Sequence, residues 1–221
     1  MATEIEIKAW ARDPAAVRRE LDKLCTFERS YLKKDIYLHG PAGRPHDSWA
    51  HWRQEGLSAG PDGTPTRPRD FRLRIEGGAA TCTFKDRSLS AGIEINREEE
   101  FTVSDARLFL ELSARLGCRV FSCKVKEGFR YWRAGEIPVV AELSHIAGLG
   151  DFIEVECVVD DNAGPTAPGR EETFTALRRF LVLLGVDAGD IESTPYAKLL
   201  ADRSERRCDG IEELDGIRFD E

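Results

Sequence analysis

The sequence lacks long apolar runs, paired cysteine motifs and an excess of positive charge. No apolar run in its 221 residues is long enough to span a bilayer, and the N-terminus lacks the apolar core of a signal peptide. We therefore expect a cytoplasmic protein with no membrane partner. The six cysteines form no Cys-x-x-Cys pair, so we expect neither a zinc site nor a disulfide framework. The net charge of -8 disfavours general nucleic-acid binding, which needs a basic surface.

Near the N-terminus, charged residues alternate with apolar ones over a short stretch of the sequence. Residues 4–8 read Glu-Ile-Glu-Ile-Lys. Because successive side chains of a strand point to opposite faces, Glu4, Glu6 and Lys8 share one face and Ile5 and Ile7 the other. Taken alone, this pattern is typical of a strand with one face in water.

The same alternation returns along the chain and predicts about eight strands. These strands cover residues 4–8, 31–38, 71–75, 80–85, 93–103, 120–132 with a bend at Gly128, 139–143 and 152–159. Helical spacing and capping signals predict helices after Asp13, after Ser104-Asp105 as far as Leu116, at about 171–184, and at 196–202 after a Thr194-Pro195 cap.

The predicted fold class is α+β, with one domain over residues 1–202. Residues 40–69 are rich in glycine and proline and form a long loop insertion, and residues 203–221 form a charged, flexible tail. Amphipathic helices can cover the apolar strand faces from outside. The charged faces would then line the interior of a barrel, and buried ions are stable there only if they pair, bind metal or stay hydrated.

The polar strand faces carry both acids and bases. Carboxylate oxygens are the ligands that Mg²⁺ and Mn²⁺ prefer, and arginine and lysine side chains match phosphate oxygens. A site with both kinds of side chain suits a metal-bound polyphosphate. The alternatives are solvated strand faces and weak surface ion pairs between these acids and bases.

The residues that carry this pattern resemble the CYTH, or triphosphate tunnel metalloenzyme, superfamily, which includes class IV adenylyl cyclases, thiamine triphosphatases and inorganic triphosphatases. In chain order the matching segments are Glu4-x-Glu6-x-Lys8, Asp35-Ile36-Tyr37, Arg72-x-Arg74, Thr83-Phe84-Lys85, Glu98-x-Glu100, Lys124-x-Lys126, residues 148–156 (Gly-Leu-Gly-Asp-Phe-Ile-Glu-Val-Glu) and Pro195-Tyr196-x-x-Leu199-Leu200. The resemblance covers roughly residues 3–201 apart from the long loop.

This resemblance implies a closed eight-stranded antiparallel β-barrel, or tunnel, with a charged interior and flanking helices. It implies Mg²⁺ or Mn²⁺ as cofactor, with metal ligands Glu4, Glu6, Glu98, Glu100, Glu154 and Glu156. The implied triphosphate contacts are Lys8, Arg72, Arg74, Lys85, Lys124, Lys126 and Arg130. The implied catalytic residues are Glu6, Lys8 and Glu156.

The sequence departs from the family pattern at two inner-face positions. Ser144 stands where cyclase-like and thiamine-triphosphatase-like members have an aspartate, with Glu142 two residues earlier on the same face. Asn96 stands where an arginine often precedes the Glu98 pair, and Arg97 is out of phase. Glu142 either joins the site or balances a neighbouring lysine.

Other polar and aromatic residues are expected to be structural. Asp35 and Tyr37 are interpreted as structural residues at the barrel rim. The two tryptophans of the long loop either pack within it or stack on a base, and the four histidines are expected at the surface or in loops. These residues are Trp49, Trp52, His39, His46, His51 and His145.

The predicted function is a divalent-metal-dependent enzyme acting on ATP, thiamine triphosphate or tripolyphosphate. It either hydrolyses the triphosphate or converts ATP to cyclic AMP and pyrophosphate. The alternative is a non-catalytic module that binds polyphosphate or a nucleotide. A third hypothesis, an interaction protein that uses the acidic tail, is supported only by the composition of the chain. The chain is expected to act as a monomer or homodimer.

Overall fold

The eight β-strands close into an antiparallel barrel in the order β1-β5-β4-β3-β2-β6-β7-β8. The computed structural model describes residues 2–40, 70–90, 93–160, 169–203, 208 and 211–218. The strands are β1 (Ala2–Trp10), β2 (Thr26–His39), β3 (Asp70–Glu76), β4 (Ala79–Ser90), β5 (Ile93–Val103), β6 (Arg119–Arg133), β7 (Val139–Ile146) and β8 (Gly150–Asp160). The helices are α1 (Pro14–Leu24), α3 (Ala106–Arg115), α4 (Arg170–Leu183) and α5 (Tyr196–Asp202), with 3-10 turns η1 (Ala188–Asp190) and η2 (Glu212–Leu214).

The α+β fold class and the closed barrel are therefore confirmed. Within the described residues, no helix has the length and apolar character needed to cross a membrane. The predicted loop residues Trp49, Trp52, His46 and His51 lie outside the described part of the chain. The predicted domain limits stay a prediction.

The chain divides into two compact units. Unit 1 comprises Met1–Tyr31, Leu89–Arg97 and Glu127–Thr194, and unit 2 comprises Leu32–Ser88, Glu98–Lys126 and Pro195–Glu221. Strands β2, β5 and β6 each have residues in both units. Each unit has its own hydrophobic core.

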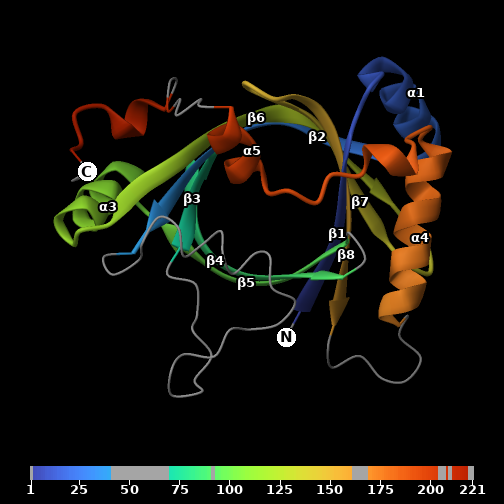
Figure 1. Cartoon of the computed structure of the whole chain (residues 1–221), viewed down its shortest axis with the longest axis horizontal. Helices are drawn as coiled ribbons and strands as arrows, with labels where there is room; N and C mark the ends of the chain where they lie inside the picture. The colour runs from blue at the N-terminus through green and yellow to red at the C-terminus, as the bar shows by residue number, and fades with distance from the viewer. Residues whose placement is uncertain are drawn as a thin grey trace. The chain divides into compact units, whose positions relative to one another are not determined.

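Unit 1 is organised around β1, which pairs with β5 and β8. Its apolar face is fully buried, since Ile5, Ile7 and Ala9 are all 0% exposed. Helices α1 and α4 lie outside the sheet and pack on this face with side chains such as Leu21 and Leu177 (Figure 1). Because the helices cover the apolar face, the charged face of β1 is turned to the enclosed side of the sheet.

Gly128 does not interrupt its strand. The sequence predicts two strand segments about a bend at this residue, whereas β6 runs unbroken from Arg119 to Arg133. An added Cβ at Gly128 would instead overlap the backbone carbonyl oxygen of Leu143 on β7. The absence of a side chain therefore allows the close approach of two strands.

Replacing Gly128 with alanine is expected to lower the free energy of unfolding by about 1–3 kcal/mol, because a backbone carbonyl cannot move aside without shifting β7. Gly189→Ala is the matched control in the same unit, since no atom lies within 4 Å of a Cβ there. Urea unfolding of both variants measures the difference. Equal stabilities would contradict the close-approach explanation.

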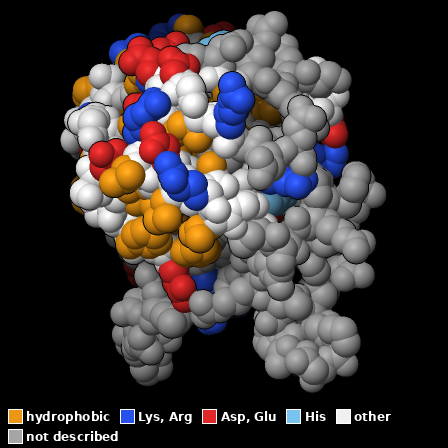
Figure 2. All heavy atoms as spheres, turned by 90° about the vertical axis from the view of Figure 1, so that its left-hand side faces the viewer, with side chains coloured by type: hydrophobic (Ala, Val, Ile, Leu, Met, Phe, Trp, Pro, Cys, Tyr) orange, Lys and Arg blue, Asp and Glu red, His pale blue; other side chains and the backbone are white. Residues whose placement is uncertain are grey.

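Unit 2 has a second core under β2, β3, β4 and α3. Ile36, Leu38, Leu73 and Leu110 are buried in it, each 0% exposed. Hydrophobic side chains also gather on the surface of this side of unit 2 (Figure 2). Among the exposed large hydrophobics are Leu108, Leu112 and Leu116, at and just after α3. Helix α3 therefore carries apolar side chains toward the core and toward the surface.

The C-terminal segment packs on unit 2 in a way the sequence did not predict. A disulfide joins Cys123 on β6 to Cys208, whereas the sequence pointed to no disulfide framework. Ile211 is 2% exposed in the core, and η2 contacts α3. The described residues of this segment are thus held in place by a covalent bond and apolar contacts, in contrast to the expected flexible tail. The pairing was missed because the two cysteines are 85 residues apart.

The turns and caps largely follow the predicted signals. Gly77 and Gly78 adopt positive φ angles of 58° and 83° between β3 and β4, as a tight two-residue hairpin turn requires. Asp13 and Asp105 cap α1 and α3 through their side chains. The predicted cap of α5 is corrected by one residue, because Pro195 occupies the N-cap position and makes no side-chain cap bond.

Candidate functional site

Unit 1 holds a cluster of three carboxylates, Glu4 and Glu6 from β1 and Glu156 from β8, hereafter the carboxylate cluster. Each contributes an oxygen, and these oxygens lie within 4.8 Å of one another. Glu6 stands directly opposite Glu156 in the β1–β8 register. The cluster forms because alternate residues of the strands face the same side.

Mutual repulsion and burial change the protonation of this cluster. Burial raises the pKa of Glu156 well above its ordinary value, and the negative charges of Glu4, Glu6 and Glu142 and a hydrogen bond with Glu4 add to the rise. The neutral form of Glu156 is therefore more favoured than in an exposed glutamate. A donor set made only of carboxylate oxygens fits a hard divalent cation, whose charge would oppose this rise in pKa.

Lys8 lies on the same face of β1 and is 3% exposed. Its ammonium donates a hydrogen bond of 2.6 Å to the carbonyl oxygen of Thr194 and lies 3.8 Å from a carboxylate oxygen of Glu94. Glu94 is itself buried and was not among the predicted site residues. A period-two signal existed, because Glu94 is in phase with Asn96 and Glu98 on β5.

Arg130 on β6 joins three acids in unit 1. Its guanidinium donates 2.9 Å hydrogen bonds to Glu142 and Glu28 and lies 3.5 Å from Glu156. Burial alone would lower the pKa of Arg130, but the hydrogen bond to Glu142 and the nearby charges raise it. Glu142, expected either to join the site or to balance a lysine, therefore pairs with this arginine. Glu154 lies in register with Lys8 on one side and Glu142 on the other.

In unit 2, two basic side chains contact Asp35 on β2, which is 0% exposed. Arg74 on β3 donates two hydrogen bonds of 2.7 and 2.9 Å to its two oxygens, and the Lys124 ammonium lies 3.0 Å away. Burial would raise the pKa of Asp35, but these two positive charges outweigh it and hold the pKa well below its ordinary value. The Lys124 ammonium also lies over the ring of Tyr196, 4.6 Å from its centroid.

A second group in unit 2 joins β3, β4 and β5. Lys85 lies 2.7 Å from Glu98, and Arg72 lies 3.7 Å from Glu98 and 3.5 Å from Glu100. Thr83 accepts from Arg72 and donates to Glu100. Burial opposes ionisation of Glu98, but Lys85 and Arg72 outweigh it and lower its pKa to about 2.

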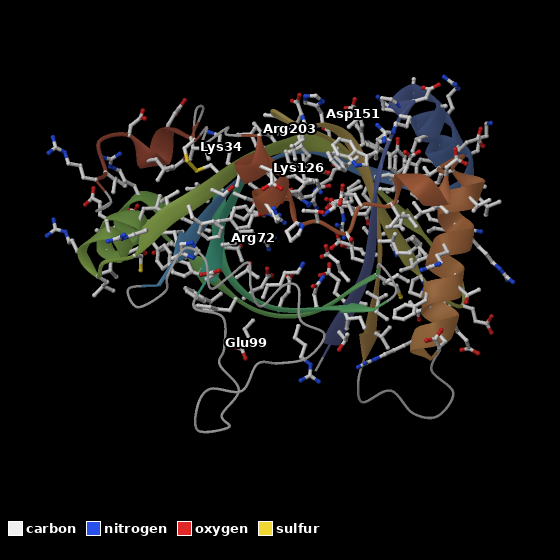
Figure 3. The ribbon with its side chains drawn as sticks, viewed as in Figure 1. Lys34, Arg72, Glu99, Lys126, Asp151 and Arg203 are labelled. Atoms are coloured by element: carbon white, nitrogen blue, oxygen red, sulfur yellow. A yellow bond between two sulfur atoms is a disulfide. The ribbon has the colours of Figure 1, made fainter. Side chains whose placement is uncertain are left out.

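The inner and outer sides of unit 2 differ as the register predicts. Arg72 and Lys126 point to the enclosed side of the sheet and Glu99 points away from it (Figure 3). Lys126 is 3% exposed. The structure thus gathers Glu4, Glu6 and Glu156 as one acidic group, whereas Glu98 and Glu100 lie among bases.

Comparison with known proteins was made by family model, by sequence and by structure. No protein-family model and no curated protein sequence matches the chain. Solved structures do match. A protein from Pyrococcus horikoshii has a TM-score of 0.65 at 23% identity, over 89% of this chain and 98% of its own. A candidate adenylate cyclase from Vibrio parahaemolyticus has a TM-score of 0.61 at 18% identity, over 90% and 97%.

A third structure is a candidate adenylyl cyclase from Hippeastrum with a dominant triphosphatase activity, with a TM-score of 0.57 at 14% identity, over 94% of this chain and 97% of its own. The chain therefore shares the barrel fold of these structures. At these identities the likeness concerns the fold, so the roles of individual residues in the barrel stay predictions.

Two other residues lie where the sequence did not predict them. His39 was expected at the surface or in a loop, but it is 2% exposed at the end of β2. Its ring stacks on Phe121 at 3.9 Å, and Nδ1 lies 2.6 Å from Asp70 on β3. Asp35, interpreted as structural, is the central acid of the basic group in unit 2. His145 is exposed, as expected, and contacts Asp151.

Proposed function

We propose that the chain is a divalent-metal-dependent enzyme that acts on triphosphates. The observation that carries this proposal is the carboxylate cluster. Three acids lie close together there, and the pKa of Glu156 is raised as a result of its burial and of the neighbouring negative charges. Such an arrangement is unfavourable for a purely structural face, and a cation that binds there would relieve it. The triphosphatase and adenylyl cyclase names of the Hippeastrum and Vibrio proteins agree with the substrate class.

In this proposal Glu4, Glu6 and Glu156 hold Mg²⁺ or Mn²⁺. The bound cation would supply Lewis-acid polarisation of a phosphoryl oxygen. Lys8 and Arg130 are positive groups of the same unit, each already oriented by fixed hydrogen bonds. Each would stabilise negative charge as it develops on a phosphate oxygen without having to reorganise first.

The basic residues of unit 2 are candidate contacts for phosphate oxygens. Arg72, Arg74, Lys85 and Lys124 are all held by acids in fixed geometries, and Arg74 is oriented by a bidentate contact with Asp35. Positioning and charge stabilisation supply most of the catalysis in phosphoryl transfer. Glu98 and Glu100 then act chiefly as counter-charges to these bases, a role that differs from the metal ligation expected from the sequence.

The test is a panel of substrates and metals on the purified chain. ATP, tripolyphosphate and thiamine triphosphate are each incubated with Mg²⁺, Mn²⁺ or EDTA, and the products are separated. We expect turnover of at least one triphosphate with metal and a fall of at least about a hundredfold with EDTA. Cyclic AMP with pyrophosphate identifies a cyclase, and ADP with phosphate identifies a hydrolase. Metal-independent binding of tripolyphosphate without turnover would instead identify a non-catalytic binding module.

A further inference from the structure

We propose that Asn96 on β5 supplies its amide oxygen to the cation held by the carboxylate cluster. The proposal rests on the proposed function, because it adds a neutral ligand to the same cation site. It makes Asn96 a determinant of metal affinity in this chain.

The position of Asn96 brings it to the cluster. Asn96 stands opposite Glu4 in the β1–β5 register, and the next inner pair is Glu94 opposite Glu6. The Nδ2 atom of Asn96 lies 3.5 Å from Oε2 of Glu4. The end of the amide is therefore directed at a carboxylate of the cluster.

The amide oxygen of Asn96 is buried and lacks a hydrogen bond. The residue is 0% exposed, and among the described residues no donor reaches its Oδ1 atom. Burying an amide oxygen without a partner is unfavourable, so native proteins rarely leave one in this state. A cation bound beside Glu4 would supply a partner for Oδ1 once the amide turns its oxygen toward Glu4, because hard cations accept amide oxygens as well as carboxylates.

The amide can present either atom to Glu4. A half-turn of the side-chain amide exchanges Oδ1 and Nδ2 with almost no change in shape. Without a cation, Nδ2 faces the Glu4 carboxylate and donates to it. With a cation on Glu4, the exchanged amide places Oδ1 on that side.

A second role for Asn96 makes a different prediction. If Asn96 only orients Glu4 through its N–H donor, then any residue without that donor would weaken metal binding. If Oδ1 is a ligand, aspartate keeps an oxygen in the same place and adds a negative charge. Leucine has nearly the same shape and offers neither atom, so the pair of substitutions separates the two roles.

The experiment titrates the full chain with Mn²⁺ alone at pH 8, by calorimetry and by the loss of the free Mn²⁺ EPR signal. Asn96→Leu is expected to weaken Mn²⁺ binding about 10- to 100-fold, while Asn96→Asp binds at least as tightly as the unchanged chain. Glu99→Gln, on the outward face of the same strand, serves as the control and should leave the affinity unchanged. Circular dichroism confirms that each variant is folded.

Unchanged affinity in folded Asn96→Leu would overturn the proposal while leaving the carboxylate site intact. Weakened binding in both Asn96→Leu and Asn96→Asp would overturn it in favour of the orienting role. If the unchanged chain itself fails to bind Mn²⁺, the proposed metal site fails and this proposal with it. The titration of the unchanged chain thus separates the two failures.

Discussion

Replacing Asp35 with asparagine is expected to lower the free energy of unfolding by about 3–5 kcal/mol. Asp35 is 0% exposed and neutralises Arg74 and Lys124, and the Lys124 side chain is only 4% exposed. Removing one member of a buried ion pair leaves a charge that is neither hydrated nor compensated, which is the costly case for buried ions. Urea unfolding at pH 7 measures the loss. Asp202→Asn is the control in the same unit, since its contact with Lys198 is at the surface and should contribute at most about 0.5 kcal/mol.

The pH dependence of stability gives an independent test of the same contact. The pKa of Asp35 is lowered in the folded chain, so the unfolded chain binds its proton more readily. The stabilisation is therefore fully present above about pH 4, the ordinary range of an aspartate, and is lost as the pH falls toward the folded pKa. The unchanged chain should lose more stability than Asp35→Asn between pH 5 and pH 3. Parallel stability curves would show that Asp35 is not held as an ionised partner.

Replacing Glu6 with glutamine is expected to reduce metal-dependent turnover at least about a hundredfold. Glu6 is one of the three acids of the carboxylate cluster and is 9% exposed. Glutamine keeps the shape but removes the negative charge that a divalent cation requires. Steady-state turnover on the best substrate of the panel, with saturating Mg²⁺ or Mn²⁺, measures the effect.

The stability of Glu6→Gln without metal separates a lost site from a lost fold. Because Glu6 contributes to the repulsion that raises the pKa of Glu156, the substitution should leave the metal-free melting temperature unchanged or higher. Added Mn²⁺ should raise the melting temperature of the unchanged chain more than that of the variant. Glu99→Gln should behave like the unchanged chain in both assays. Full turnover in Glu6→Gln would contradict the metal assignment.

Local patterns predicted the strands and their faces well. The alternation in residues 4–8 is enough to place Ile5 and Ile7 on one face and Glu6 on the other, because side-chain alternation depends only on neighbouring residues. The first five residues of β2, residues 26–30, were missed because all five are exposed and no apolar alternation marks them. Glu94 could have been found by extending the phase of Glu98 backward along β5.

Partners across strands were not predictable from the same patterns. Arg130 was placed on the polar face, but its bonds to Glu142 and Glu28 depend on which strands and loops meet. His39 is buried because Asp70 and Phe121 happen to reach it, and neither is close to it in sequence. The resemblance to CYTH proteins supplied the closed barrel. The bases that surround Glu98 and Glu100 became visible only from the contacts of these acids with Lys85 and Arg72.

The bond between Cys123 and Cys208 bears on how the C-terminal boundary of this protein is chosen. A polypeptide shortened to end at Asp202 would leave Cys123 as a lone sulfhydryl next in sequence to Lys124, the partner of Asp35. It would also remove Ile211, Leu214 and Ile217, which pack in or against the apolar core of unit 2. Expression of this protein for crystals or assays should therefore retain the sequence at least to Ile217, under conditions that allow the sulfurs to oxidise.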